Sequence, residues 1–175
     1  MYFSHFPLIE YDSTGNGNPK GVTNLLRRVA VRSKVKTNTS LYDTYDVKEG
    51  ETPEIIAHRL YGDAELHWVI LLFNNVKDRY HDWPMAGNQF NEFLQDKYDN
   101  IDGIHHYEID ADSGHDTGKI DVGLTNDDYP SATPITNREY EEAQQDMKRR
   151  IKLLDPRYVE DFVEEFKRLT QENVI

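Results

Sequence analysis

The chain has 175 residues, of which 37% are hydrophobic and 30% are charged, enough for one ordinary domain or two very small ones. Its formal net charge of −12 argues against nucleic acid as the main partner, because phosphate binding needs a clustered positive field. The absence of cysteine excludes a disulfide framework, a thiolate metal site and a cysteine nucleophile.

The N-terminal part is expected to contain a strand and a helix. Residues 6–12 are typical of a short strand, and the turn-forming residues of 13–21 predict a loop. From Val22 the apolar residues fall at helical spacing, but the residues that follow alternate as in a strand, so helix or strand stays open for 29–36. A basic run here is either a solvated helix face or a docking surface for an acidic partner: Arg27, Arg28, Arg32, Lys34 and Lys36.

A strand, a tight turn and a helix are expected in succession around Gly50. Tyr45 and Val47 alternate with polar neighbours, as one edge of a half-buried strand does. Thr52 is a good helix N-cap, and Pro53 suits the first helical position because its missing N–H costs nothing there.

A second helix is expected after Gly62, which ends the first, with Asp63 as its cap. Residues 68–73 are apolar on nearly every side, so this helix must be covered from more than one direction. Leaving two or three such side chains in water would forfeit about 1.5–3 kcal/mol each. We expect the cover to come from flanking segments, from a partner, or from both.

Shorter elements follow. Residues 88–98 predict a helix, residues 106–110 and 119–122 predict a β-hairpin with a long tip, and residues 127–134 predict a loop.

The C-terminal part predicts a helical hairpin. A capping box of Thr136 and Glu139 begins its first helix, and Asp155 and Pro156 end that helix and start the second. Apolar residues repeat at helical spacing along both helices: Tyr140, Ala143, Met147, Ile151 and Leu154, then Val159, Phe162, Val163, Phe166 and Leu169. The hairpin must pack on the rest of the domain or on a neighbouring subunit.

No arrangement typical of catalysis is present. The chain has no glycine-rich phosphate loop, no Gly-x-Ser-x-Gly elbow and no His-Glu-x-x-His helix. His105 and His106 are expected to point apart on a strand, so they do not chelate one metal together. Residues 110–116 fail as an EF-hand, because Gly114 replaces a ligand, although a weak ion site at this tip stays an alternative. We therefore expect no enzyme, no metal and no cofactor.

Export and membrane insertion are not expected either. No stretch approaches the roughly 18–20 apolar residues that span a bilayer. The first seven residues lack the basic start and apolar run of a secretion signal. This argues against a secreted cell-wall enzyme.

The order of elements around Gly50 resembles the LysM module, which binds aminosugar polymers or serves as an architectural element. Under the sugar-binding alternative, the ligand is peptidoglycan and the groove is formed by two turns: Gly50, Glu51, Thr52, Asn74 and Asn75. The chain differs from sugar-binding modules in one feature. Such modules usually have a return strand after the second helix, whereas here residues 78–84 and then a further helix occupy that position.

A longer stretch is similar to the baseplate wedge protein 53 family of contractile-tailed bacteriophages. The similarity is best over residues 42–98 and looser over 7–11 and 148–154. It is carried by Leu60-Tyr61-Gly62, Trp68-Val69-Ile70-Leu71-Leu72, Asn74-Asn75 and Trp83-Pro84. It implies a non-enzymatic virion protein, assembled in the host cytoplasm, that joins neighbouring wedges to one another and to the central hub.

Together these patterns predict an α+β protein with a LysM-like β-α-α core, extended by a β-hairpin and a C-terminal helical hairpin. The expected segments are the N-terminal extension (1–41), the LysM-like module (42–98), the hairpin and loop (99–134) and the helical hairpin (135–175). The residues expected at interfaces with other wedge and hub proteins are Arg27, Arg28, Arg32, Trp68, Ile70, Leu71, Phe73, Tyr80, Trp83, Met147, Ile151, Phe162 and Phe166.

Overall fold

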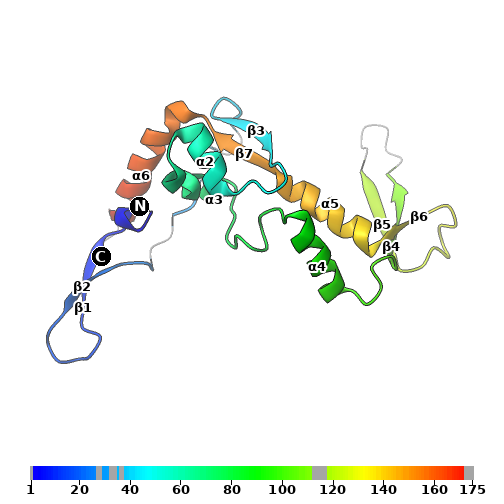
Figure 1. Ribbon diagram of the computed structural model, residues 1–175, viewed down its shortest axis with the longest axis horizontal. Coiled ribbons are helices and arrows are strands. Elements are labelled where there is room, and N and C mark those ends of the chain that lie inside the picture. Colours follow the sequence, from blue (N-terminus) through cyan, green and yellow to red (C-terminus); the bar gives the residue numbers. More distant parts are fainter. Residues whose placement is uncertain (1, 27–28, 32–34, 36–37, 112–117, 172–175) are drawn as a thin grey trace. The chain divides into compact units, whose positions relative to one another are not determined.

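The computed structural model describes residues 2–26, 29–31, 35, 38–111 and 118–171. It combines helices with short antiparallel sheets, which confirms the predicted α+β class (Figure 1). The chain divides into two compact units, one formed by Met1–Asp82 with Arg150–Ile175 and the other by Trp83–Arg149. The first unit combines both ends of the chain, whereas the four segments expected from the sequence are consecutive.

The first unit is built on a two-stranded sheet. Its elements in chain order are η1 (Tyr2–His5), β1 (Leu8–Tyr11), β2 (Lys20–Thr23), β3 (Tyr42–Asp46), α2 (Pro53–Tyr61), η2 (Ala64–Leu66), α3 (His67–Phe73), β7 (Arg150–Leu154), η3 (Pro156–Tyr158) and α6 (Val159–Gln171). β3 pairs antiparallel with β7, with Tyr42 opposite Leu154 and Tyr45 opposite Ile151. The order strand, helix, helix, strand is therefore completed by β7, which comes after the whole second unit in the sequence.

Local signals set the limits of α2, as predicted. The Oγ1 of Thr52 accepts a hydrogen bond from the N–H of Ile55 at 3.4 Å, and Pro53 occupies the first turn. Gly62 ends the helix with a positive φ of 77° and donates its N–H to the carbonyl of His58.

The predicted C-terminal helical hairpin is wrong. Its first helix, α5 (Asn137–Arg149), ends where β7 begins, and Ile151 and Leu154 lie in that strand. Ile151 and Leu154 are three residues apart, a spacing that also fits a helix. Pairing with β3, however, provides hydrogen-bond partners for the backbone of β7 and buries both side chains. The second predicted helix is present as α6.

The N-terminal part forms a hairpin of β1 and β2. Ile9 lies opposite Val22, so the helix expected from Val22 is wrong at that residue. The β-branched residues of β2 favour an extended strand, and helical spacing of a few apolar residues does not outweigh this. Residues 29–31 lie in neither helix nor strand, and the rest of 29–36, apart from Val35, is outside the described residues.

The second unit contains two helices and a three-stranded sheet. Its elements besides α5 are α4 (Gly87–Lys97), β4 (Ile104–Asp110), β5 (Lys119–Gly123) and β6 (Thr133–Thr136), with sheet order β5-β4-β6. Ile109 lies opposite Ile120, which confirms the predicted hairpin. Its tip, 112–117, lies outside the described residues, and so does most of the alternative ion site. The loop expected up to residue 134 is wrong at its end, where Pro134 is accommodated because β6 is an edge strand.

Side chains of α4 and α5 are joined through Glu141. This buried carboxylate accepts hydrogen bonds from the Nζ of Lys97 at 2.6 Å and from the hydroxyl of Tyr98 at 2.8 Å. Burial acts to raise the pKa of Glu141, but these two partners outweigh it and hold that pKa below its ordinary value. The predicted capping box at the start of α5 is confirmed, since Thr136 and Glu139 exchange hydrogen bonds of 2.8 and 3.2 Å.

Candidate functional site

α3 is the buried centre of the first unit. Trp68, Val69, Ile70 and Phe73 are each no more than 5% exposed. This burial agrees with the prediction that a helix apolar on nearly every side is covered from more than one direction.

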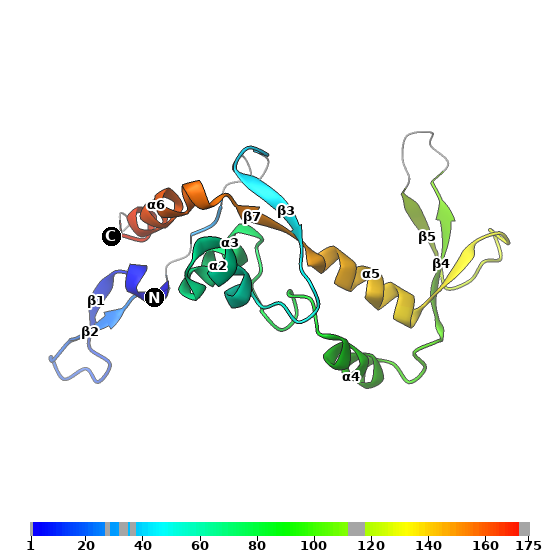
Figure 2. The same cartoon turned by 45° about the horizontal axis from the view of Figure 1, so that its top comes forward.

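Both ends of the chain provide the cover for α3. The ring of Trp68 lies 5.3 Å from that of Tyr2 and 4.7 Å from that of Phe166, centroid to centroid. The hydroxyl of Thr170 donates a hydrogen bond of 2.9 Å to the carbonyl of His5, which links α6 to η1. α6 lies beside α3 in both views (Figures 1 and 2). The flanking segments of this same chain therefore shield the aromatic face.

The residues expected at interfaces differ widely in exposure. Tyr80 and Met147 are 81% and 62% exposed, and Leu71 and Phe162 are half-buried. Six others are buried within the chain: Trp68, Ile70, Phe73, Trp83, Ile151 and Phe166. The expected basic surface, Arg27, Arg28 and Arg32, lies outside the described residues, as do Lys34 and Lys36.

The turn around Gly50 is held by a network centred on Glu51. Its carboxylate accepts hydrogen bonds from the hydroxyl of Tyr45 at 2.6 Å, the N–H of Lys48 at 3.0 Å and the guanidinium of Arg59 at 2.6 Å. Burial acts to raise the pKa of Glu51, but these donors outweigh it and lower the pKa to about 2. The charged carboxylate therefore fastens the turn to β3 and α2.

Asn74 ties the end of α3 to β7. Its Nδ2 donates to the carbonyl of Lys152 at 2.8 Å and to that of Ile70 at 2.9 Å, while its Oδ1 accepts from the N–H of Lys152 at 2.8 Å. The side chain thus pairs with the backbone of β7 much as a neighbouring strand would. Asn75 follows with a positive φ of 58°, a conformation that Asn tolerates better than most residues.

These contacts bear on the alternative sugar groove. Glu51, Thr52 and Asn74 already hydrogen-bond to their own chain, and Gly50 and Asn75 supply the positive φ that two turns require. A ligand that recruited these side chains would have to break bonds that hold the module together. The motif Asn74-Asn75 therefore has a structural role that its sequence does not reveal.

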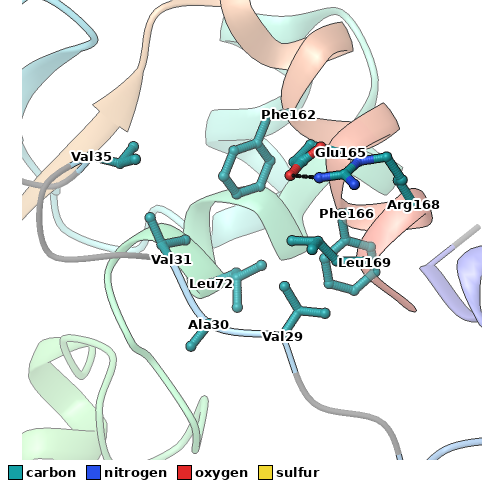
Figure 3. A pocket seen from close by; sticks show the side chains of 10 residues that line it. All are labelled: Val29, Ala30, Val31, Val35, Leu72, Phe162, Glu165, Phe166, Arg168 and Leu169. Carbon is teal, nitrogen blue, oxygen red and sulfur yellow. Dashed lines mark hydrogen bonds and ion pairs between the residues drawn. The ribbon is translucent and has the colours of Figure 1, made fainter. Parts of the chain in front are cut away.

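An open pocket of about 390 Å³ lies between α6 and four residues of the N-terminal part, 29–31 and 35. Figure 3 shows its side chains, most of them apolar: Val29, Ala30, Val31, Val35, Leu72, Phe162, Phe166 and Leu169, with Glu165 and Arg168. Arg168 donates to Glu165 at 2.6 and 2.7 Å, so the charged groups at this pocket neutralise each other. The lining offers an apolar contact surface and no arrangement suited to catalysis.

Large apolar side chains are exposed in both units, and sequence reasoning missed most of them. The N-terminal apolar set lies on and after the β1–β2 hairpin: Leu8, Tyr11, Val22, Leu25 and Leu26. The sheet apolar set lies in the second unit: Ile104, Ile120, Leu124 and Tyr129. Such a residue can be recognised when its place in the strand pattern suggests burial but the side chain is exposed. This comparison requires the partners of each strand to be known.

His105 and His106 approach each other, and the expectation that they point apart is wrong. The pairing of β4 with β6 is irregular between Ile104 and His106, and this irregularity brings the two Nδ1 atoms to 2.9 Å. In the part of the chain that the structure describes, no three His, Asp or Glu side chains are grouped to hold a metal ion, and the two histidines are no exception. None of the helices described is both long and apolar enough to cross a membrane.

Comparison with known proteins places this geometry in context. The family model of base plate wedge protein 53 matches residues 1–116. The baseplate wedge protein gp53 of Enterobacteria phage T4 is 30% identical over 106 residues, which cover 59% of this chain. The match spans 54% of that relative, so the chain aligns with only about half of its length.

Proposed function

The chain belongs to the base plate wedge protein 53 family, and from this premise we propose that it is a structural component of a contractile phage tail baseplate. In this role it joins adjacent wedges to each other and to the central hub through protein–protein contacts. Its partners are other wedge and hub proteins, its place is the tail of the virion, and its assembly takes place in the host cytoplasm. It performs no catalysis.

The observation that carries this proposal is the exposure of large apolar side chains in both units. Leu26 in the first unit is 90% exposed and Leu124 in the second is 77% exposed. Exposed apolar groups that gather in one region mark interaction sites. A two-stranded hairpin such as β1–β2 is marginally stable by itself, which favours a partner against it. A connector needs at least two such contact regions.

We further propose that β3, α2, α3 and β7 form a LysM-like core that serves as an architectural element. The order of these elements and the antiparallel pairing of β3 with β7 support this proposal. Peptidoglycan binding by the same core is the alternative, and the hydrogen bonds that occupy Glu51 and Asn74 argue against it. Co-sedimentation with cell-wall sacculi would favour the alternative.

Native mass spectrometry of the tagged chain purified from its native source tests the proposal. Co-purification with tail or baseplate subunits in a fixed ratio is the expected result. A lone monomer would contradict the connector role.

Single substitutions then separate the two apolar sets. Leu26→Lys and Leu124→Lys should each reduce co-purification about tenfold, and each should affect a different partner. Ile55→Lys is the control, because Ile55 is also an exposed apolar residue, at 50%, but lies on α2, outside both sets. An equal loss of co-purification in all three variants would refute the assignment of two contact regions. The absence of any loss in both Leu26→Lys and Leu124→Lys would refute it as well.

A further inference from the structure

A second open pocket, of about 280 Å³, lies within the second unit between the start of α4 and the C-terminal half of α5. Its lining combines apolar, amide and charged residues: Met85, Gly87, Phe90, Glu142, Gln145, Asp146 and Arg149. Its volume is below the roughly 300–1,000 Å³ that is typical of pockets for small-molecule ligands. The pocket therefore suits a single protruding side chain.

Two carboxylates border this pocket. Glu142, Gln145, Asp146 and Arg149 share one face of α5, because they follow one another at intervals of three, one and three residues. Asp146 lies 3.8 Å from the guanidinium of Arg149. Glu142 is exposed and makes no ion pair with any other residue that the structure describes. The row of side chains therefore has negative charge available at its Glu142 end.

The charge of the whole unit also favours a cationic occupant. Residues 83–149 contain five Lys and Arg against fifteen Asp and Glu, so the second unit carries −10 of the formal −12 of the chain. A positive side chain is attracted to such a surface and an anionic one is repelled. Lysine fits the two carboxylates best, because its ammonium is a compact charge with three donors, whereas the fork of Arg matches one carboxylate.

Gln145 lacks one hydrogen-bond partner that an occupant can supply. It is only 3% exposed, and its Oε1 accepts the N–H of Met85 at 3.0 Å. Its Nε2 has no acceptor among the described residues. A buried N–H without an acceptor is costly, so an occupant that brings a carbonyl oxygen completes the site. Ala86 has no side chain to cap the first turn of α4, which favours an incoming oxygen at the same place.

We propose that this pocket binds one lysine residue of a partner protein. The ammonium lies between Glu142 and Asp146. The methylene stem packs against Met85 and Phe90. The backbone carbonyl of the same lysine accepts a hydrogen bond from the Nε2 of Gln145. That the partner is a baseplate subunit rests on the proposed function, whereas the recognition of lysine does not.

Nuclear magnetic resonance of the ¹⁵N-labelled full chain, titrated with the blocked tripeptide acetyl-Gly-Lys-Gly-amide, tests the proposal. The side-chain amide signals of Gln145 and the backbone signal of Phe90 should shift together and saturate. The same peptide with norleucine in place of lysine keeps the stem and the carbonyl, and without the ammonium it should bind about tenfold more weakly. Butylamine has the ammonium but no peptide carbonyl, so it should leave the Gln145 amide signals unchanged.

Glu142→Gln removes one charge from the pocket and should weaken binding of the lysine peptide about tenfold. Glu92→Gln is the matched control, because Glu92 is an exposed acid of α4 outside the pocket and its replacement changes the net charge equally. Equal weakening in both variants, equal affinity for the norleucine peptide, or the absence of a saturable shift would overturn the proposal. Shifts of the same signals when the chain alone is concentrated would assign the pocket to a second copy and overturn the partner.

This result can be told apart from the test of the connector role. If the lysine peptide fails to bind while baseplate subunits still co-purify with the chain, only the lysine pocket is refuted. If the peptide binds but no subunit co-purifies, only the connector role is refuted.

Discussion

Replacing Asn74 with Ala tests whether one side chain holds β7 against α3. The variant loses both bonds to the backbone of Lys152 and leaves an N–H and a carbonyl of a half-buried strand without their partner. At about 0.5–1.5 kcal/mol for each of these two bonds, with a smaller loss at the carbonyl of Ile70, we expect the first unit to lose about 2–3 kcal/mol.

Urea unfolding measures this loss if the signal comes from the first unit alone. The chain has two tryptophans, so the comparison is made in a Trp83→Phe background in which only Trp68 reports. Asn75→Gly is the matched control, because Gly adopts the positive φ of this position readily, and it should change stability by less than about 0.5 kcal/mol. If Asn74→Ala unfolds at the same urea midpoint as Asn75→Gly, the pairing with β3 is sufficient to hold β7 in place.

Further substitutions probe other parts of both units. Trp68→Ala should cost about 3–5 kcal/mol in a thermal melt because it leaves a cavity beneath both chain ends, whereas Tyr80→Ala, at an exposed residue, should cost less than about 0.5 kcal/mol. Because the pKa of Glu51 is about 2 when folded and near 4.5 otherwise, its contribution to stability is present above pH 4.5 and is lost as the pH falls towards 2. The stability difference between wild type and Glu51→Gln in urea should therefore shrink across that window, and a constant difference would contradict the network. Glu141→Ala should destabilise the second unit by about 2–3 kcal/mol in hydrogen exchange, and the exposed neighbour Glu142→Ala should not.

Elements with local signals could be predicted from the sequence. Thr52 and Gly62 delimit α2 because each acts on backbone groups within a few residues, and the capping box of Thr136 and Glu139 works in the same way. The hairpin of β4 and β5 also followed from alternation on either side of a turn. In these places neighbouring residues decide the structure.

Elements that depend on distant partners could not be predicted. Ile151 and Leu154 fit a helix as well as a strand, and only the pairing with β3, about a hundred residues earlier in the chain, selects the strand. The cover of α3 is of the same kind, since His5 and Thr170 are separated by 165 residues. The sequence showed that Trp68 needed cover, but it could not show which segment provides it.

The candidate site was harder to predict than the fold for the same reason. Asn74 stood out as part of a motif, yet its role depends on Lys152, which no local pattern connects to it. Apolar residues with similar sequence patterns can also be either buried or exposed. Phe166 fills the core of the first unit, whereas Leu26 is exposed, and both belong to segments that suggested an interface or a helix.

The position of the second unit in the sequence gives the Asn74 contact a further meaning. The chain leaves the first unit after Asp82 and re-enters it at Arg150, so the core must close around a long excursion. Asn74 and Lys152 lie on either side of that excursion and bond to each other, which closes the first unit without help from the second. If the chain acts as the proposed connector, this closure would let the first unit stay folded while the second unit engages a partner.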